Sequence, residues 1–249
     1  MLKHLLKYVF VVVFAIAGFQ TKAMPISVDL ELQLLVDVSG SVDNNEYLLQ
    51  KQGYVDAFND VNLWNAIEEG SIGAIAVQYI EWSGSTQQAV LVDWVLIDSF
   101  AAAQAFAAQI DATSRTYAGA TAPGSAINFG VQEFTDNGFD GTRQVIDISG
   151  DGQQNDGANT AAARDAALLA GIDAINGIVI SGDAGLEAWY NANVKGGTGS
   201  FVQPVSDFSD FGTAVENKLI REVSSVPEPT TMLMFIASIL GFAGRRVFS

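Results

Sequence analysis

The sequence has no cysteine and a single histidine, His4, which lies in a segment that we expect to be removed from the mature protein. The mature chain would then carry neither a thiol nor an imidazole. Their absence excludes Ser-His-Asp and Cys-His catalysis, zinc held by His or Cys, and disulfide bonds. The stability of the protein must therefore come from the packing of its core.

Basic residues are also scarce: 12 Lys and Arg stand against 28 Asp and Glu, for a formal net charge of −16. The first 23 residues contain Lys3, Lys7 and Lys22 but no acid, so the imbalance is larger in the rest of the chain. A surface this acidic repels phosphate backbones, and we expect no nucleic-acid partner. It favours cations, although an acidic surplus is most often only a solvated face.

Residues 1–23 have the three parts of a secretory signal peptide. Lys3 and Lys7 form a basic start, residues 8–18 are an apolar stretch too short to cross a bilayer comfortably, and Ala23 ends a small-residue cleavage pattern. We predict cleavage after Ala23 and export of the mature chain. An N-terminal membrane anchor is the alternative interpretation.

Between residues 24 and 223, apolar strand patterns alternate with helical patterns, and we find no linker and no internal repeat. The predicted strands cover residues 28–38, 71–82, 88–97, 143–149, 172–180 and 200–204. The predicted helices cover residues 44–63, 100–110, 125–134, 158–170, 185–192 and 207–223. The pattern predicts one α/β domain with three layers: a mostly parallel, Rossmann-like central sheet with one antiparallel edge strand, and helices on both faces.

The first predicted strand ends in a carboxylate, Asp37. Two hydroxyl residues, Ser39 and Ser41, follow it at alternate positions. Ligands of an open α/β sheet bind at the carboxyl ends of its strands. Three oxygens at that edge would suit a hard cation such as Mg²⁺. The simpler interpretation is a strand followed by a Ser/Gly turn, with Asp37 as a helix cap.

Two more segments are expected at the same edge of the sheet. Residues 119–125 form a loop of small residues that contains Thr121, and Asp151 stands between two glycines after the strand 143–149. Together with the first segment they would complete a set of five oxygen ligands. Asp147, in the middle of that strand, is a candidate sixth ligand, but we expect it to form hydrogen bonds to neighbouring loops instead.

These residues resemble the metal-ion-dependent adhesion site of the von Willebrand factor type A (vWA) domain, whose pattern is Asp-x-Ser-x-Ser, a distant Thr and a distant Asp. Asp37, Ser39, Ser41, Thr121 and Asp151 match it in order, although Ala120 stands where many members have Gly. The ending Ser-Gly-Asp-Gly and the length are also similar to a subgroup of secreted bacterial domains, DUF1194. The resemblance implies that the three hydroxyls contact Mg²⁺ (or Mn²⁺ or Ca²⁺), while both Asp residues act largely through water. The cation would then bind an acidic group of a partner, an unknown protein or extracellular polymer.

Residues 224–249 differ from the domain. Pro227, Glu228 and Pro229 precede an apolar stretch at residues 232–243, and Arg245 and Arg246 follow it. This order resembles a PEP-CTERM sorting signal, which implies that the tail enters the inner membrane of a Gram-negative bacterium transiently and that an exosortase cleaves it. The mature protein would then reach the cell surface or extracellular matrix. An ordinary tail anchor is the alternative.

We therefore expect a non-enzymatic, surface-sorted adhesion module that holds its ligand through a divalent cation. The rival hypothesis is an extracellular hydrolase, metal-assisted or using Asp37 and Asp151 as paired carboxylates. A third is a structural matrix protein whose domain has lost its ligand. Four tryptophans are candidates for a carbohydrate platform, but their scatter over separate elements favours packing roles: Trp64, Trp82, Trp94 and Trp189.

Overall fold

A computed structural model of the chain describes residues 24–181 and 184–224. The predicted signal peptide and sorting tail, including Pro227, Glu228, Pro229, Arg245 and Arg246, lie outside the described residues. Within the described part, no helix is both long enough and apolar enough to cross a membrane.

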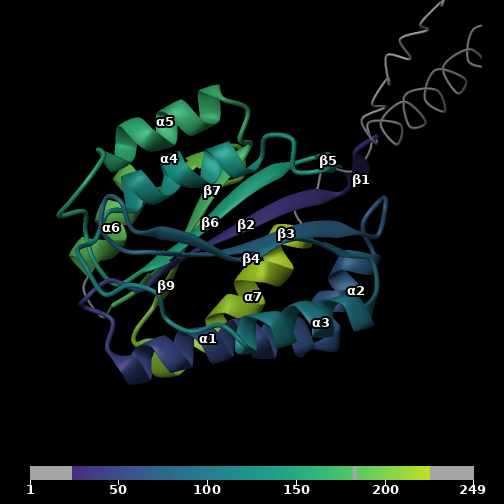
Figure 1. Ribbon diagram of the computed structural model, residues 1–249, viewed down its shortest axis with the longest axis horizontal. Coiled ribbons are helices and arrows are strands. Elements are labelled where there is room, and N and C mark those ends of the chain that lie inside the picture. Colours follow the sequence, from purple (N-terminus) through teal and green to yellow (C-terminus); the bar gives the residue numbers. More distant parts are fainter. Residues whose placement is uncertain (1–23, 182–183, 225–249) are drawn as a thin grey trace, which may run out of the picture.

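A seven-stranded sheet forms the centre of the domain, in the order β4-β3-β2-β6-β7-β8, with β9 also paired to β7 (Figure 1). The strands are β2 (Leu30–Asp37), β3 (Ile75–Trp82), β4 (Gln88–Ile97), β6 (Gln144–Gly150), β7 (Ala174–Ile180), β8 (Gly196–Gly197) and β9 (Val202–Val205). β2 pairs in parallel with β3 and β6, and β7 pairs in parallel with β6 and β9. β4 is antiparallel to β3, which confirms the predicted antiparallel edge, and the two-residue β8 adds a second antiparallel pairing at the other edge.

Helices cover both faces of this sheet, as predicted (Figure 1). One layer contains α1 (Asn44–Asn59), α2 (Val61–Glu68), α3 (Phe100–Asp111) and α7 (Phe211–Ser224). The opposite layer contains α4 (Pro123–Glu133), α5 (Thr160–Leu169) and α6 (Ala184–Asn193). β2 is buried along its whole length, because its even-numbered leucines enter the core under the first layer and Leu35 enters the core under the second.

Several predicted boundaries were wrong. The helix expected at 44–63 is two helices, because Asp60 adopts an extended conformation and its side chain caps α2 by accepting a hydrogen bond from Asn62 N. The strand expected from residue 71 begins at Ile75, since residues 71–73 turn around Asp29, whose carboxylate accepts hydrogen bonds from Ile72 N and Gly73 N. The last helix begins with a 3₁₀ turn, Phe208–Asp210, before α7.

The sequence analysis also missed three short strands. β1 (Ile26–Val28) and β5 (Phe139–Gly141) form a small parallel pair of their own, and β8 has only two residues. Strands this short carry too few residues for an alternating pattern to be recognised. None of them lies at the carboxyl edge of β2 and β6, so the predicted position of the candidate site is unaffected.

Candidate functional site

Five residues predicted from the sequence meet at the carboxyl edge of the sheet; we call Asp37, Ser39, Ser41, Thr121 and Asp151 the edge site. Asp37 is the last residue of β2, and Asp151 directly follows the neighbouring strand β6. Thr121 comes from the loop that leads into α4. Adjacent parallel strands end at the same edge, which is why residues more than 100 positions apart lie together.

A series of hydroxyl contacts joins four of the five residues. The hydroxyl oxygens of Ser39 and Ser41 are 3.1 Å apart, and Ser41 Oγ donates a hydrogen bond to Asp151 Oδ1 over 2.6 Å. On the other side, Thr121 Oγ1 lies 3.4 Å from Ser39 Oγ. Thr121 and Ser39 are buried, whereas Ser41 is exposed and Asp151 half-buried, so the edge site opens to solvent on the side of Ser41.

Asp37 is the most deeply buried acid of this group. Its Oδ1 accepts a hydrogen bond from the backbone N–H of Ser39 over 2.7 Å, while its Oδ2 is buried and has no hydrogen-bond partner among the described residues. Burial, reinforced by the negative charge of Asp151, raises the pKa of Asp37 to about 7. Burial also raises the pKa of Asp151. No basic side chain among the described residues offsets the negative charge of either acid at this edge.

Three residues that the sequence analysis did not single out hold the edge site in place. Nη2 of Arg115 donates to the carbonyl oxygens of Val38, Ser39 and Val42 at 2.8–2.9 Å, which fixes the loop after β2. Gln50 of α1 donates from Nε2 to the Asp37 carbonyl oxygen over 2.8 Å, and Asn155 accepts a hydrogen bond from Thr121 N over 2.9 Å. These contacts join distant segments, and no local pattern in the sequence indicates them.

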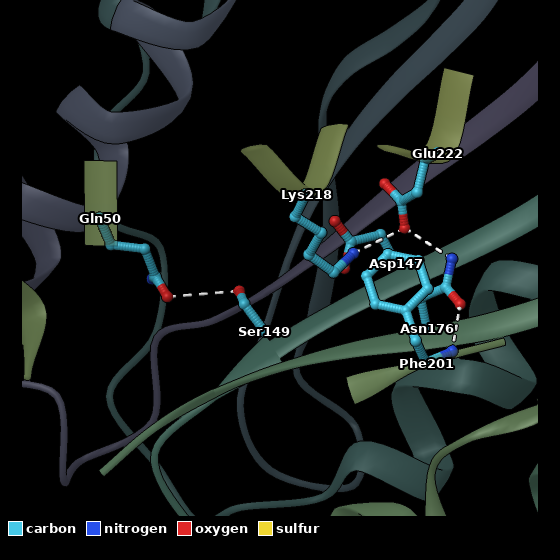
Figure 2. A network of polar contacts seen from close by, with 7 residues as sticks. All are labelled: Gln50, Asp147, Ser149, Asn176, Phe201, Lys218 and Glu222. Carbon is cyan, nitrogen blue, oxygen red and sulfur yellow. Dashed lines mark hydrogen bonds and ion pairs between the residues drawn. The ribbon is translucent and has the colours of Figure 1, made fainter. Parts of the chain in front are cut away.

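The structure places Asp147 away from the edge site and also away from the neighbouring loops to which we expected it to bond. Its carboxylate forms an ion pair with Lys218 of α7, beneath the middle of the sheet (Figure 2).

The four tryptophans are distributed through the domain: Trp82 is buried, and the others are partly buried against core clusters. They form no shared platform among the described residues.

The donor atoms of the edge site suit a hard cation. They comprise carboxylate and hydroxyl oxygens only, and one carboxylate oxygen is buried without a partner. In the part of the chain that the structure describes, no cluster of three or more His, Cys, Asp or Glu residues is placed to hold a metal. A cation at the edge site would thus depend on the three hydroxyls in addition to Asp37 and Asp151.

Comparison with known proteins identifies the family. The model of the family described as "Protein of unknown function (DUF1194)" matches residues 27–227, which is most of the chain. The chain belongs to the DUF1194 family. In this member, the PEP-CTERM protein-sorting motif also matches residues 225–247. No curated protein matches the chain.

Solved structures show that this DUF1194 domain has a vWA-like fold. Proximal thread matrix protein 1 from the mussel byssus is 16% identical with a TM-score of 0.57, over 82% of this chain and 49% of that one. A second structure of that mussel protein, described as having a zinc-occupied MIDAS motif, is 14% identical with a TM-score of 0.55 over the same shares. The pilus adhesin SpaC from Lactobacillus rhamnosus GG is 13% identical with a TM-score of 0.56, over 82% of this chain and 31% of that one. The chain therefore spans about half or less of these proteins, and the likeness is one of fold.

Proposed function

We propose that this DUF1194 protein is an exported, surface-sorted binding module that holds its ligand through a divalent cation at the edge site. The observation that carries the proposal is the convergence of three hydroxyls and two uncompensated acids at an edge open to solvent, with Asp37 Oδ2 buried and unpartnered. Mg²⁺ is the cation that this set of oxygens suits best, with Mn²⁺ and Ca²⁺ as alternatives. The zinc-occupied MIDAS of a structure with the same fold supports the use of a metal.

The same geometry supports an external ligand rather than a closed structural metal site. The three hydroxyls are neutral ligands, and only two carboxylates, Asp37 and Asp151, lie among them. A cation held by this set would keep part of its charge, and the site is open to solvent at Ser41. An acidic group of a protein or extracellular polymer would bind the cation from that side through a charge-assisted contact.

Binding explains the edge site better than hydrolysis does. A glycosidase-type mechanism requires two carboxyl groups that face the substrate. Asp37 is completely buried, and its Oδ1 is occupied by the Ser39 backbone. Asp151 alone is open enough to meet a substrate.

Metal-linked stability tests this function directly. A cation that binds only the folded state increases the free energy of unfolding by mass action, by about 2.7 kcal/mol at 100 times its Kd. The melting temperature rises accordingly. We expect Mg²⁺ or Mn²⁺ to raise the melting temperature of the wild-type protein and to leave that of Asp37→Ala unchanged. Asp140→Ala is the matched control, because Asp140 is an exposed acid on β5, at the other end of the sheet. Equal shifts in all three proteins would show that the cation acts only on general surface charge.

Ligand binding requires a separate experiment. Ser39→Asp places a carboxylate where a neutral hydroxyl faces the cation, and it should preserve the fold but abolish capture of the partner from the organism's own extracellular matrix. Chelator should have the same effect on the wild-type protein. Capture that survives both treatments would place the ligand elsewhere on the domain.

The sorting motif at residues 225–247 supports processing of the tail by an exosortase, with transient insertion in the inner membrane of a Gram-negative bacterium. We expect material isolated from the cell surface or matrix to lack residues 232–249. Mass spectrometry of that material decides the question, since retention of Arg245 and Arg246 would instead indicate a permanent tail anchor.

A further inference from the structure

The amine of Lys218 is completely buried between α7 and the middle of the sheet, in contact with two carboxyl groups (Figure 2). We call Lys218, Asp147 and Glu222 the buried triad, because all three side chains have no exposed surface. Lys218 Nζ forms an ion pair with Asp147 Oδ1 on β6, and it lies 2.6 Å from Glu222 Oε1, one helical turn further along α7. An amine, a carboxyl group and a second acid are thus in direct contact, out of reach of bulk water.

Neighbouring groups fix this arrangement. Asn176 on β7 is the register partner of Asp147, and its Nδ2 donates to Glu222 Oε1 over 2.7 Å. The Oδ1 of Asn176 accepts a hydrogen bond from Phe201 N over 3.0 Å, and the ring of Phe201 lies 5.5 Å from Lys218 Nζ. The buried triad is therefore held from two strands, one helix and the segment before β9, which is the kind of fixed proximity that accelerates a reaction between two groups.

As a purely ionic cluster, the buried triad is poorly satisfied. It contains two acids and one amine, and Asp147 Oδ2 and Glu222 Oε2 have no hydrogen-bond partner among the described residues. Buried ion pairs compensate their desolvation only when such lone pairs are satisfied. Burial, followed by the negative charge of Glu222, raises the pKa of Asp147, so its carboxyl group takes up a proton readily and its Cγ becomes more electrophilic.

We propose that Lys218 and Asp147 are joined by an intramolecular isopeptide bond, formed with Glu222 as the catalytic proton-transfer residue. Condensation removes one of the unsatisfied carboxylate oxygens and the charges of two of the three groups. The product is a neutral amide whose N–H faces Glu222. The inference is independent of any metal at the edge site.

The reaction balances without an oxidant or a further reactant. The lone pair of Lys218 Nζ forms the new bond to Asp147 Cγ, and the bond from Cγ to one carboxylate oxygen breaks. Of the three protons of the ammonium group, one stays on the amide nitrogen and two leave with the departing oxygen as water. Glu222 touches Nζ and relays these protons, and it ends in the ionisation state in which it began.

Such a bond would tie the last described helix to the central part of the sheet. α7 ends at Ser224, directly before the sorting motif, and the chain has no cysteine with which to form a disulfide. A cross-link between residues 147 and 218 would keep α7 in place while the C-terminal tail is processed. It would also restrict the unfolded chain by closing a long loop, as a disulfide does.

Peptide mapping of the protein purified from an exporting host tests the bond. Trypsin does not cleave after an acylated lysine, so the linked product joins residues 144–164 to residues 196–221. We expect its mass to equal the sum of these two peptides less one water, and fragmentation to place the link at Asp147 and Lys218. Recovery of only the free peptides 144–164 and 196–218 from folded wild-type protein would overturn the proposal and leave a non-covalent cluster.

The role of Glu222 is tested by substitution. Glu222→Gln preserves the acceptor for Asn176 but cannot relay protons, so we expect the linked peptide to disappear and the free peptides to replace it. Glu216→Gln, the same change on the more exposed face of α7, is the matched control and should keep the link. Full cross-linking in Glu222→Gln would overturn the assignment of Glu222 as the catalytic residue.

Discussion

The same strand, β6, leads to two acidic clusters that are neutralised in different ways. Asp151, at its exit, belongs to the edge site, where no basic side chain pairs with either carboxylate among the residues that the structure describes. Asp147, inside the strand, faces the amine of Lys218. The guanidinium of Arg115 donates to backbone carbonyl oxygens of the loop after β2 rather than to either acid. A cluster that contains its own amine is suited to holding the fold together, whereas a cluster without a basic group is suited to binding a cation from outside.

The largest expected effect comes from removal of the Lys218 amine, and with it of the bond that we propose between Lys218 and Asp147. Lys218→Met leaves the carboxyl groups of Asp147 and Glu222 buried without their amine partner, and we expect the free energy of unfolding to fall by about 3–5 kcal/mol in urea denaturation. Lys51→Met is the control, because Lys51 makes only a 3.8 Å contact with the exposed Asp111 and donates to backbone carbonyls. That change should cost about 1 kcal/mol or less. A similar loss in both variants would remove the distinction between the buried triad and an ion pair with an exposed partner.

The second effect concerns the cluster without a cation, measured in chelator. The folded protein holds a proton on Asp37 up to about pH 7, while the unfolded chain releases it near the ordinary value of 3.8. The folded state thus binds more protons between these values, and the free energy of unfolding of metal-free wild-type protein should fall as the pH rises through them. Asp37→Asn should remove this fall and be more stable than the wild type at pH 8, by at most about 4 kcal/mol.

Denaturation of both proteins across pH 4–8 measures the difference. Mg²⁺ should restore the free energy of unfolding of the wild-type protein at pH 8 and leave that of Asp37→Asn unchanged. Parallel pH profiles in chelator would mean that Asp37 is stabilised as an anion by groups of the protein itself, in which case the contrast with the buried triad fails.

The edge site was accessible to sequence analysis because its residues come in a local pattern at the ends of recognisable strands. Asp37, Ser39 and Ser41 directly follow an apolar run, and the alternation of elements brings Thr121 and Asp151 to the same edge. The sheet and the two helical layers followed from the same alternation, and the antiparallel edge followed from two consecutive strands, 71–82 and 88–97, joined by a short polar link. The boundaries that failed depend on single side chains, such as Asp60 and Asp29, whose carboxylates compete with the backbone for hydrogen bonds.

The buried triad was not predicted, and its physical character explains why. Lys218 and Glu222 are four residues apart on a helix, which is the usual spacing of an exposed ion pair. Only the packing of α7 against β6 and β7 places this pair on a buried face beside Asp147 and Asn176. The contacts of Arg115 were likewise inaccessible, because they are made to backbone atoms of a segment about 75 residues away.

A smaller effect should come from filling space beside Asp37. A Cβ atom at Gly150 would lie 2.4 Å from Tyr190 Oη and 2.8 Å from Asp37 Oδ2, so Gly150→Ala must displace one of them. We expect a loss of about 1–3 kcal/mol in stability together with weaker binding of Mg²⁺. Gly152→Ala is the control, since its nearest contact, Thr121 Cγ2, would be an ordinary 3.5 Å away. Equal behaviour of the two variants in denaturation and metal titration would show that the position of Asp37 is not critical.

The smallest expected effect tests how the loop of the edge site is held. Nη2 of Arg115 donates to three carbonyl oxygens at once, and Nε donates to Tyr117 O over 2.9 Å. A lysine keeps the charge but cannot reproduce the planar array of donors, so Arg115→Lys should retain the fold and lose only about 1 kcal/mol of stability. Because Ser39 is then less firmly oriented, Mg²⁺ affinity should fall by roughly tenfold.

Arg164→Lys is the control, because it alters contacts to Ala192 O and Asp165 on another part of the domain, and it should leave the affinity unchanged. Calorimetric titration of both variants provides the measurement, and an unaltered affinity in Arg115→Lys would show that the loop after β2 keeps its geometry without the guanidinium.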